Sequence, residues 1–126
     1  MTEQKVDVIV NAGLLLRAFE GVIDNAVRYT DSGGTISIST LLLNNAPCVE
    51  VRDSGIGIEE VDMPHIFDRF FRADKARQIN SDGSKLGLAI IKRIIRAHDG
   101  HITVESTPRA GTCVRIIFNS IASVEA

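Results

Sequence analysis

The feature that most constrains the fold is the order in which helical and strand-like periodicities follow one another. Apolar residues recur three and four positions apart over roughly residues 14–29 and again from Leu86 to about residue 99, which predicts two amphipathic helices. Two alternating segments joined by a turn follow each helix, at 35–43 and 48–53 and at 101–106 and 112–118. This order predicts an α+β two-layer sandwich, in which about three helices cover one face of a mixed, mostly antiparallel sheet.

Two different segments lie between the first helix with its hairpin and the second helix with its hairpin. The segment from Glu59 to Val61, which opens with two acidic residues, predicts the start of a short third helix. The apolar residues of "PHIFDRFF" are expected to pack on the core as one turn. Residues 72–83 carry mixed charges with one weak apolar residue, Ile79, so we expect a mobile loop there. The end of the second helix is expected at Gly100, acting as its C-cap, and residues 119–126 are expected to fray.

Composition narrows the class of protein. With 126 residues the chain is expected to form one domain, and its formal charge of −2 gives no electrostatic reason to expect nucleic acid or an anionic membrane as a partner. No apolar run approaches the roughly 18 residues needed to span a bilayer, and the N-terminus has no signal-peptide pattern. Cys48 and Cys113 fall in strand-like segments and are interpreted as reduced, buried thiols of a cytoplasmic protein, with one disulfide left open.

Two polar residues stand out against the apolar pattern. Asn25 lies on the first helix in "DNAVRYT", and its amide oxygen suits a hard cation such as Mg²⁺, although a solvated polar face is the simpler interpretation. Asp53 ends a strand and precedes Gly55 and Gly57. A carboxylate there can accept a hydrogen bond from a planar amine while the glycines let a ring lie against the backbone; the alternative is an ordinary Asp-Ser-Gly turn.

A third feature is "GSKLGL", Gly83 to Leu88, which leads into the second long helix. Unpaired amides at a helix N-terminus bind phosphate, which predicts an anion site here. The alternative is that Gly83 ends a loop and Gly87 allows close helix packing. The stretch is not a P-loop, because GxxxxGK[ST] is absent, and it is not a dinucleotide fingerprint, because no strand precedes it.

Taken together, these motifs resemble the catalytic ATP-binding domain of sensor histidine kinases, within the ATPase superfamily that includes gyrase, Hsp90 and MutL. "DNAVRYT" is similar to the N box, "DSGIGI" to the first glycine box, and "PHIFDRFFRADKAR" to the F box. "GSKLGLAIIKRIIRAHDGHITVES" resembles the second glycine box with its helix and strand, and "GTCVRIIF" the closing strand. The resemblance covers roughly residues 6–118 and implies the Bergerat ATP-binding fold.

The resemblance also implies a set of site residues. Asp53 would accept from the adenine amino group, Asn25 would coordinate Mg²⁺ bridging the phosphates, and residues 72–84 would form a lid over ATP. The full ATP-binding set implied in this way is Asn25, Arg28, Tyr29, Asp53, Gly55, Gly57, Ile58, Phe67, Arg72, Gly83, Ser84, Lys85, Leu86, Gly87, Leu88 and Thr112. Asn25 is the metal ligand, and no catalytic residue is expected in this chain beyond the ATP site.

Three positions depart from the family's pattern. Gly21 stands four residues before Asn25, where these kinases usually have a second Asn and related ATPases a water-activating Glu, so Mg²⁺ would lose a partner. Gly13 replaces an Asp that commonly caps the first helix, which predicts a weaker cap. Lys85 replaces a glycine, and it would either add positive charge near the γ-phosphate or crowd the backbone.

The implied function is donation of the γ-phosphoryl group of ATP to a histidine on a separate dimerisation domain, with a response regulator downstream. His65, His98 and His101 fit no phospho-acceptor motif, so the acceptor is expected outside this chain, in a membrane-linked sensor of which this is a cytoplasmic portion. The departures leave open a degenerate module that binds nucleotide weakly and signals through partner contacts. A free-standing serine kinase acting on a sigma-factor antagonist is a third alternative.

Overall fold

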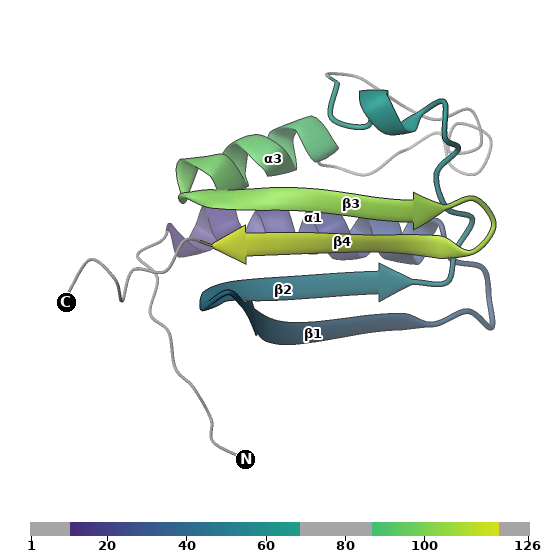
Figure 1. Cartoon of the computed structure of the whole chain (residues 1–126), viewed down its shortest axis with the longest axis horizontal. Coiled ribbons are helices and arrows are strands. Elements are labelled where there is room, and N and C mark those ends of the chain that lie inside the picture. Colours follow the sequence, from purple (N-terminus) through teal and green to yellow (C-terminus); the bar gives the residue numbers. More distant parts are fainter. Residues whose placement is uncertain (1–10, 69–86, 119–126) are drawn as a thin grey trace, which may run out of the picture.

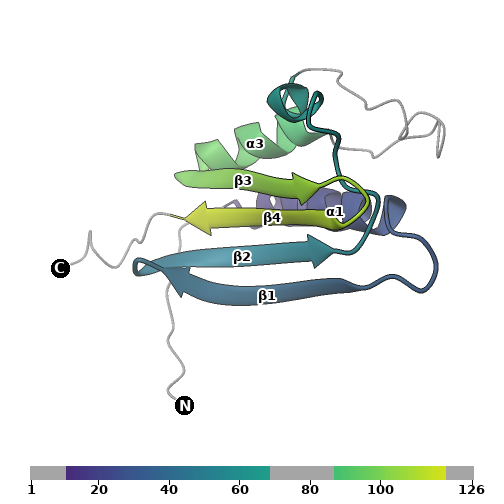
Figure 2. The same cartoon turned by 45° about the vertical axis from the view of Figure 1, so that its right-hand side comes forward.

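A computed structural model describes residues 11–68 and 87–118 of the chain. Its elements, in chain order, are α1 (Ala12–Arg28), β1 (Ile36–Leu43), β2 (Ala46–Asp53), the 3₁₀ turn η1 (Met63–His65), α3 (Leu88–Ala97), β3 (Gly100–Thr107) and β4 (Gly111–Phe118). The strands form one sheet in the order β1-β2-β4-β3, and each neighbouring pair is antiparallel. Both long helices lie on the same face of this sheet (Figures 1 and 2). The predicted α+β two-layer fold is confirmed.

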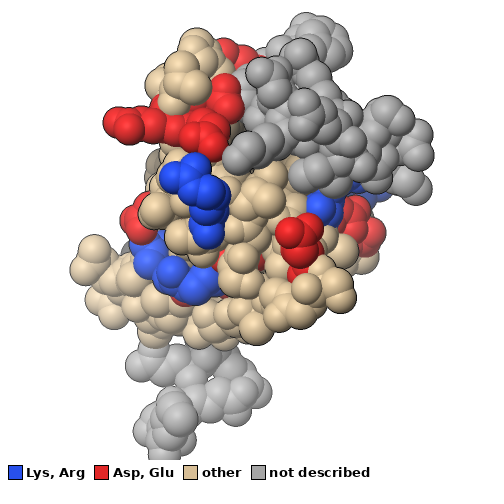
Figure 3. Space-filling view, turned by 90° about the vertical axis from the view of Figure 1, so that its right-hand side faces the viewer, with Lys and Arg blue, Asp and Glu red and all other residues tan. Residues whose placement is uncertain are grey.

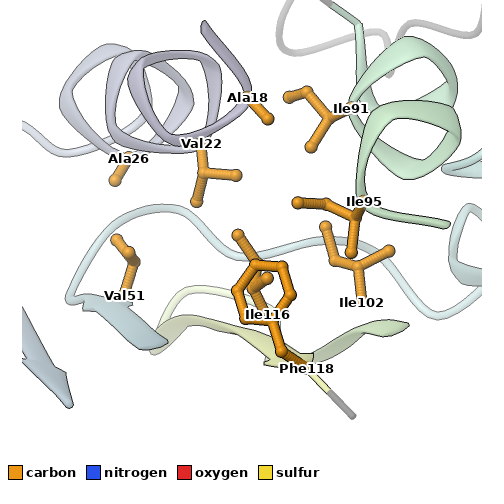
Figure 4. Close-up of a cluster of buried hydrophobic side chains, with 9 residues drawn as sticks. All are labelled: Ala18, Val22, Ala26, Val51, Ile91, Ile95, Ile102, Ile116 and Phe118. Atoms are coloured by element: carbon orange, nitrogen blue, oxygen red, sulfur yellow. The ribbon is translucent and has the colours of Figure 1, made fainter. Parts of the chain in front are cut away.

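The core fills the space between the helices and the sheet. Figure 4 shows Ala18 of α1 and Ile91 of α3 pointing toward one another, above side chains that rise from β2, β3 and β4. The small side chain of Ala18, which is fully buried, lets the two helices approach closely. The buried cluster consists of Ala18, Val22, Ala26, Val51, Ile91, Ile95, Ile102, Ile116 and Phe118.

The edge strand β1 shows why alternation alone does not measure burial. Ile38 pairs directly with Val51, so both side chains point to the helix-covered face, as the alternating pattern predicts. Val51 is buried, whereas Ile38 is 53% exposed, because α1 packs over β2 and the core rather than over β1. Leu42, on the same face as Ile38, is 39% exposed for the same reason.

The first helix has a stronger N-cap than the sequence predicted. It begins at Ala12, two residues earlier than expected, and the side chain of Asn11 accepts a hydrogen bond from the backbone N–H of Leu14 at 3.1 Å. The backbone N–H of Asn11 in turn donates to Nε2 of His98 at 2.9 Å, while Nδ1 of His98 lies 2.7 Å from the carbonyl oxygen of Ile94. The prediction that Gly13 weakens this cap is therefore wrong, because Asn11 supplies the capping group.

Two other expected boundaries also move. Residues 60–62 form a turn, and the short helical element starts only at Met63, with Pro64 as its second residue. Helix α3 ends at Ala97, and Asp99 rather than Gly100 adopts the left-handed conformation, with φ of 58°. Gly100 is instead the buried first residue of β3, where a Cβ would lie 2.8 Å from the side chain of Ile95.

The sheet face opposite the helices carries a charged ladder. Nε of Arg115 donates to Glu50 at 2.8 Å, and its guanidinium also reaches Glu105 at 3.3 Å, while Arg52 binds the other Glu50 oxygen at 3.3 Å. The hydrogen bond from Arg115 lowers the pKa of Glu50. Cys48 and Cys113 lie on this face as buried free thiols, as predicted, and burial raises the pKa of each. Within the described ranges, no helix is long and apolar enough to cross a membrane.

Candidate nucleotide site

The site is built around Asp53, the last residue of β2. Strand pairing sets Asp53 opposite Thr112, the second residue of β4, at one end of the sheet. Its Oδ1 accepts backbone hydrogen bonds from Gly55 at 2.8 Å and from Thr112 at 3.2 Å. Its Oδ2 accepts none from the residues that the structure describes, so one carboxylate oxygen remains available to a ligand.

Burial makes the ionised form of Asp53 less favourable than it is in water. Desolvation by burial raises the pKa of the Asp53 carboxyl, and the hydrogen bonds from Gly55 and Thr112 only partly oppose this shift. A donor that reaches Oδ2 would stabilise the charged form and recover part of the desolvation cost. The carboxylate is thus held in a position where it favours a ligand that donates a hydrogen bond.

The loop after Asp53 requires its two glycines. A Cβ on Gly55 would lie 2.1 Å from the carbonyl oxygen of Tyr29, because Ile56 N–H donates to that carbonyl at 3.0 Å and draws the loop against the end of α1. Gly57 has a φ of 72°, and a Cβ there would lie 2.2 Å from the carbonyl oxygen of Thr107. The loop is therefore wedged between α1 and the β3–β4 hairpin, and close backbone contacts require both glycines.

The C-terminal turn of α1 lies at the same end of the sheet as Asp53 (Figure 2). Asn25 is half-buried on this turn, one turn after the buried Gly21. Nε and Nη1 of Arg28 and Oγ1 of Thr30 are buried without a hydrogen-bond partner among the described residues. A buried guanidinium without a partner is costly, and its geometry suits a carboxylate or phosphate, so Arg28 is fitted to an anion.

The described residues offer few side chains that could hold a metal ion together with Asn25. Among the described residues, no three His, Cys, Asp or Glu side chains gather closely enough to hold a metal ion. A Mg²⁺ ion would therefore depend on the Asn25 amide oxygen, on water and on the ligand's own phosphates, which is a usual arrangement for Mg²⁺ with nucleotides.

The start of α3 offers backbone amides to an anion. Gly87 is its N-cap, without a side-chain hydrogen bond, and its carbonyl accepts from Ile90 and Ile91, each at 3.1 Å. The amides of Leu88 and Ala89 thus have no acceptor within the helix. A Cβ on Gly87 would meet no described atom within 4 Å, so packing among these residues does not require a glycine there.

The remaining predicted residues divide into two groups. Phe67 packs against the core, with Nζ of Lys92 lying 4.7 Å from its ring centroid, and the backbone N–H of Ile58 donates to Oγ of Ser106 at 2.8 Å. The second group, together with the proposed lid at 72–84, lies outside the described residues and stays a prediction: Arg72, Gly83, Ser84, Lys85 and Leu86.

Sequence reasoning missed Ser106. Its hydroxyl binds Ile58, the carbonyl of Gly111 at 3.0 Å and Oγ1 of Thr112 at 2.8 Å. The available signal was periodicity: Ser106 continues the inward-facing alternation of Ile102 and Val104, so it is a polar residue at an apolar position.

The surface at this end carries charges of both signs. Figure 3 looks onto this end of the molecule and shows groups of acidic and of basic side chains among uncharged residues. A cavity of about 330 Å³ lies here, with Ser37, Arg52, Glu105 and Cys113 of the ladder face in its lining. Its lining includes Asp53, Ser106 and Thr112, but not Asn25, Arg28 or Gly55.

Comparison with known proteins identifies the family. Residues 11–120 match the family described as histidine kinase-, DNA gyrase B-, and HSP90-like ATPase. This chain belongs to that family. The signal transduction histidine-protein kinase ArlS of Staphylococcus aureus is 36% identical over 118 residues, which cover 94% of this chain and 26% of ArlS. The chain thus spans about a quarter of the length of such curated relatives.

Solved structures agree with this assignment. A mycobacterial sensor histidine kinase, MprB, superposes with a TM-score of 0.78 at 30% identity, covering 90% of this chain and 76% of that one. A nucleotide-free catalytic domain of histidine kinase ThkA gives a TM-score of 0.72 at 25% identity, covering 88% of this chain and 69% of that one. The predicted resemblance to the catalytic domain of sensor histidine kinases is confirmed.

Proposed function

We propose that this chain is the ATP·Mg²⁺-binding catalytic domain of a sensor histidine kinase, and that it donates the γ-phosphoryl group to a histidine on a separate dimerisation domain. The observation that carries the proposal is the half-buried Asp53, whose Oδ1 is held by two backbone amides. Its Oδ2 binds none of the described residues and can accept from the adenine amino group. The match to histidine kinases supports ATP as the nucleotide.

The other site residues bind different parts of ATP·Mg²⁺. Gly55 and Gly57 keep the loop close to the sheet so that an adenine ring can lie against backbone, and Tyr29 flanks it. Arg28 brings to the phosphates two guanidinium nitrogens that have no partner among the described residues, and the amides at Gly87 and Leu88 approach the phosphates from α3. When bound at Asn25, Mg²⁺ would neutralise charge on the phosphate oxygens. Phosphoryl transfer depends mainly on such positioning and charge neutralisation.

The proposal extends to partners. The acceptor histidine belongs to a dimerisation domain, the phosphoryl group passes on to a response regulator, and the domain works on the cytoplasmic side of a membrane-linked sensor. The names of the relatives as signal transduction and sensor histidine kinases support this setting.

The decisive measurement is calorimetric titration with a non-hydrolysable ATP analogue, with and without Mg²⁺. Asp53→Asn replaces the acceptor Oδ2 by an amide, so we expect affinity to fall at least about tenfold, which is ~1.4 kcal/mol and within the range for a hydrogen bond to a charged group. Asp99→Asn, an exposed Asp-to-Asn change in a left-handed position that Asn tolerates, is the matched control. Unchanged affinity in folded Asp53→Asn protein would remove Asp53 from the site.

One observation favours a second candidate, a degenerate module that binds nucleotide weakly. Gly21 is buried one turn before Asn25 and offers no side chain to a cation. If that absence weakens Mg²⁺ binding, Gly21→Asn should strengthen only the Mg²⁺-dependent part of ATP affinity. Gly21→Ala separates this effect from the gain of up to about 1 kcal/mol that any replacement of a mid-helix glycine brings. Equal Mg²⁺ dependence in all three proteins argues against the degenerate module.

A further inference from the structure

Ser106 binds two of the segments that position the adenine side of the site, the glycine loop and the start of β4. Its Oγ accepts from the N–H of Ile58, at the end of the glycine loop, at 2.8 Å. It also lies 3.0 Å from the carbonyl oxygen of Gly111 and 2.8 Å from Oγ1 of Thr112, at the start of β4. The same loop and the same end of β4 supply the two amides that hold Oδ1 of Asp53.

The chemistry of these three contacts fixes the direction of each proton. A serine hydroxyl has one proton and two lone pairs, and a backbone N–H can only donate while a carbonyl can only accept. The N–H of Ile58 therefore donates to one lone pair of the Ser106 hydroxyl, and that hydroxyl donates its proton to the carbonyl oxygen of Gly111. The contact with Thr112 is then satisfied only if the Thr112 hydroxyl donates to the second lone pair, and this is the arrangement in which all three contacts are hydrogen bonds.

This assignment has a consequence for the ligand. Because the single proton of the Thr112 hydroxyl is directed at Ser106, Oγ1 of Thr112 retains only acceptor capacity, as does the ionised Oδ2 of Asp53. Both oxygens can then form a hydrogen bond only with a donor on the base. A purine with a carbonyl oxygen at position 6 would present an acceptor to two acceptors, which is unfavourable.

We infer that Ser106 is a specificity-determining positioning residue, which selects a 6-amino purine over a 6-oxo purine by holding the Thr112 proton away from the base. The inference rests on the proposed function, because it requires the base to lie at Asp53. It assigns to Ser106 a role distinct from simple packing, since the effect passes through the hydroxyl of Thr112.

The test compares ATP with ITP, which differ at position 6 of the base, by titration of the full chain. In Ser106→Ala the Thr112 proton is free to turn toward a 6-oxo group, so the ratio of ATP to ITP affinity should fall about fivefold, equivalent to one hydrogen bond. Ser106→Thr retains the hydroxyl and should retain the native ratio. Thr103→Ala, an exposed hydroxyl on the ladder face of the same strand, is the matched control and should leave the ratio unchanged.

A double mutant separates this role from a structural one. Ser106→Ala also releases the amide of Ile58, which should weaken both nucleotides together and leave their ratio alone. In a Thr112→Val background there is no hydroxyl proton to redirect, so adding Ser106→Ala should no longer change the ratio. A change of ratio that persists in that background overturns the inference.

The outcomes also distinguish this inference from the proposed function. A native chain that prefers ATP, with the same preference in folded Ser106→Ala protein, overturns the role of Ser106 and leaves the proposed function standing. A native chain that binds ATP and ITP equally overturns the assignment of Asp53 to the adenine amino group, and the role of Ser106 with it. Thermal unfolding of each nucleotide-free variant establishes that it is folded.

Discussion

At the scale of single residues, the site holds polar groups in arrangements that are costly without a ligand. Asp53 is half-buried with one free carboxylate oxygen, and Arg28 has two buried nitrogens without a partner among the described residues. Such groups reduce stability in the empty state and are compensated when a ligand of matching chemistry binds. Binding residues of this kind should therefore be replaceable with a gain in stability and a loss of affinity.

The pH dependence of stability tests whether Asp53 lowers the stability of the nucleotide-free protein. Burial raises its pKa above the ordinary value of 3.8, so the unfolded chain ionises more readily and the ionised carboxylate opposes folding. This cost is absent below 3.8 and fully present once the pH exceeds the raised value. Without nucleotide, we expect Asp53→Asn to unfold at a higher temperature than the native chain at pH 7, with a difference that shrinks as the pH approaches 4. A variant less stable than the native chain at pH 7 would contradict this reading of the burial cost.

At the scale of elements, stability comes from the contact of α1 and α3 with one face of the sheet. Adjacent residues on α3 differ completely in environment: Ile91 is fully buried against Ala18, whereas Ile90 is 47% exposed. The helix is thus held by a narrow apolar stripe, and Ile90 and Ile91 provide an internal comparison.

Removing the Ile91 side chain should leave a cavity between the helices. We expect Ile91→Ala to lower the free energy of unfolding by about 3 kcal/mol, and Ile90→Ala to lower it by less than about 1 kcal/mol. Urea unfolding of both variants measures the difference. Similar losses in the two would mean that α3 is not packed on α1 through Ile91.

At the scale of the whole molecule, the three described histidines differ in how their rings are engaged. Both ring nitrogens of His98 are engaged, one by the amide of Asn11 and the other by the carbonyl of Ile94. Nδ1 of His65 binds Asp68 at 2.9 Å, and His101 lies on β3, on the face opposite the helices. In the proposed function, the acceptor histidine belongs to another domain, so none of these three histidines is expected to be labelled.

Phosphotransfer can be tested by adding that acceptor. Incubated with radiolabelled ATP and Mg²⁺, the chain alone should incorporate no label. A separately purified dimerisation domain from the same sensor should become labelled only when the chain is present, and Asp53→Asn should reduce the rate. Stable labelling of the chain itself, at a histidine or a serine, would contradict the proposed acceptor and favour a different kinase class.

The sequence by itself determined the order of the elements, the two hairpins and the glycine loop after Asp53. These depend on local properties: periodicity fixes which side chains share a face, and a carboxylate followed by two glycines shapes a strand end. Short motifs shared with the family then predicted Asn25, Arg28 and Asp53 as site residues.

Only the tertiary structure decided which of those faces is covered and which polar groups meet. Ile36, Ile38 and Leu42 share one side of β1, but α1 lies too far from that edge to bury Ile38. The bond from Asn11 to His98 joins residues 87 positions apart, and that from Ile58 to Ser106 joins residues 48 apart. Local sequence cannot predict such pairs, because each hydrogen bond forms only when the fold brings distant segments of the chain together.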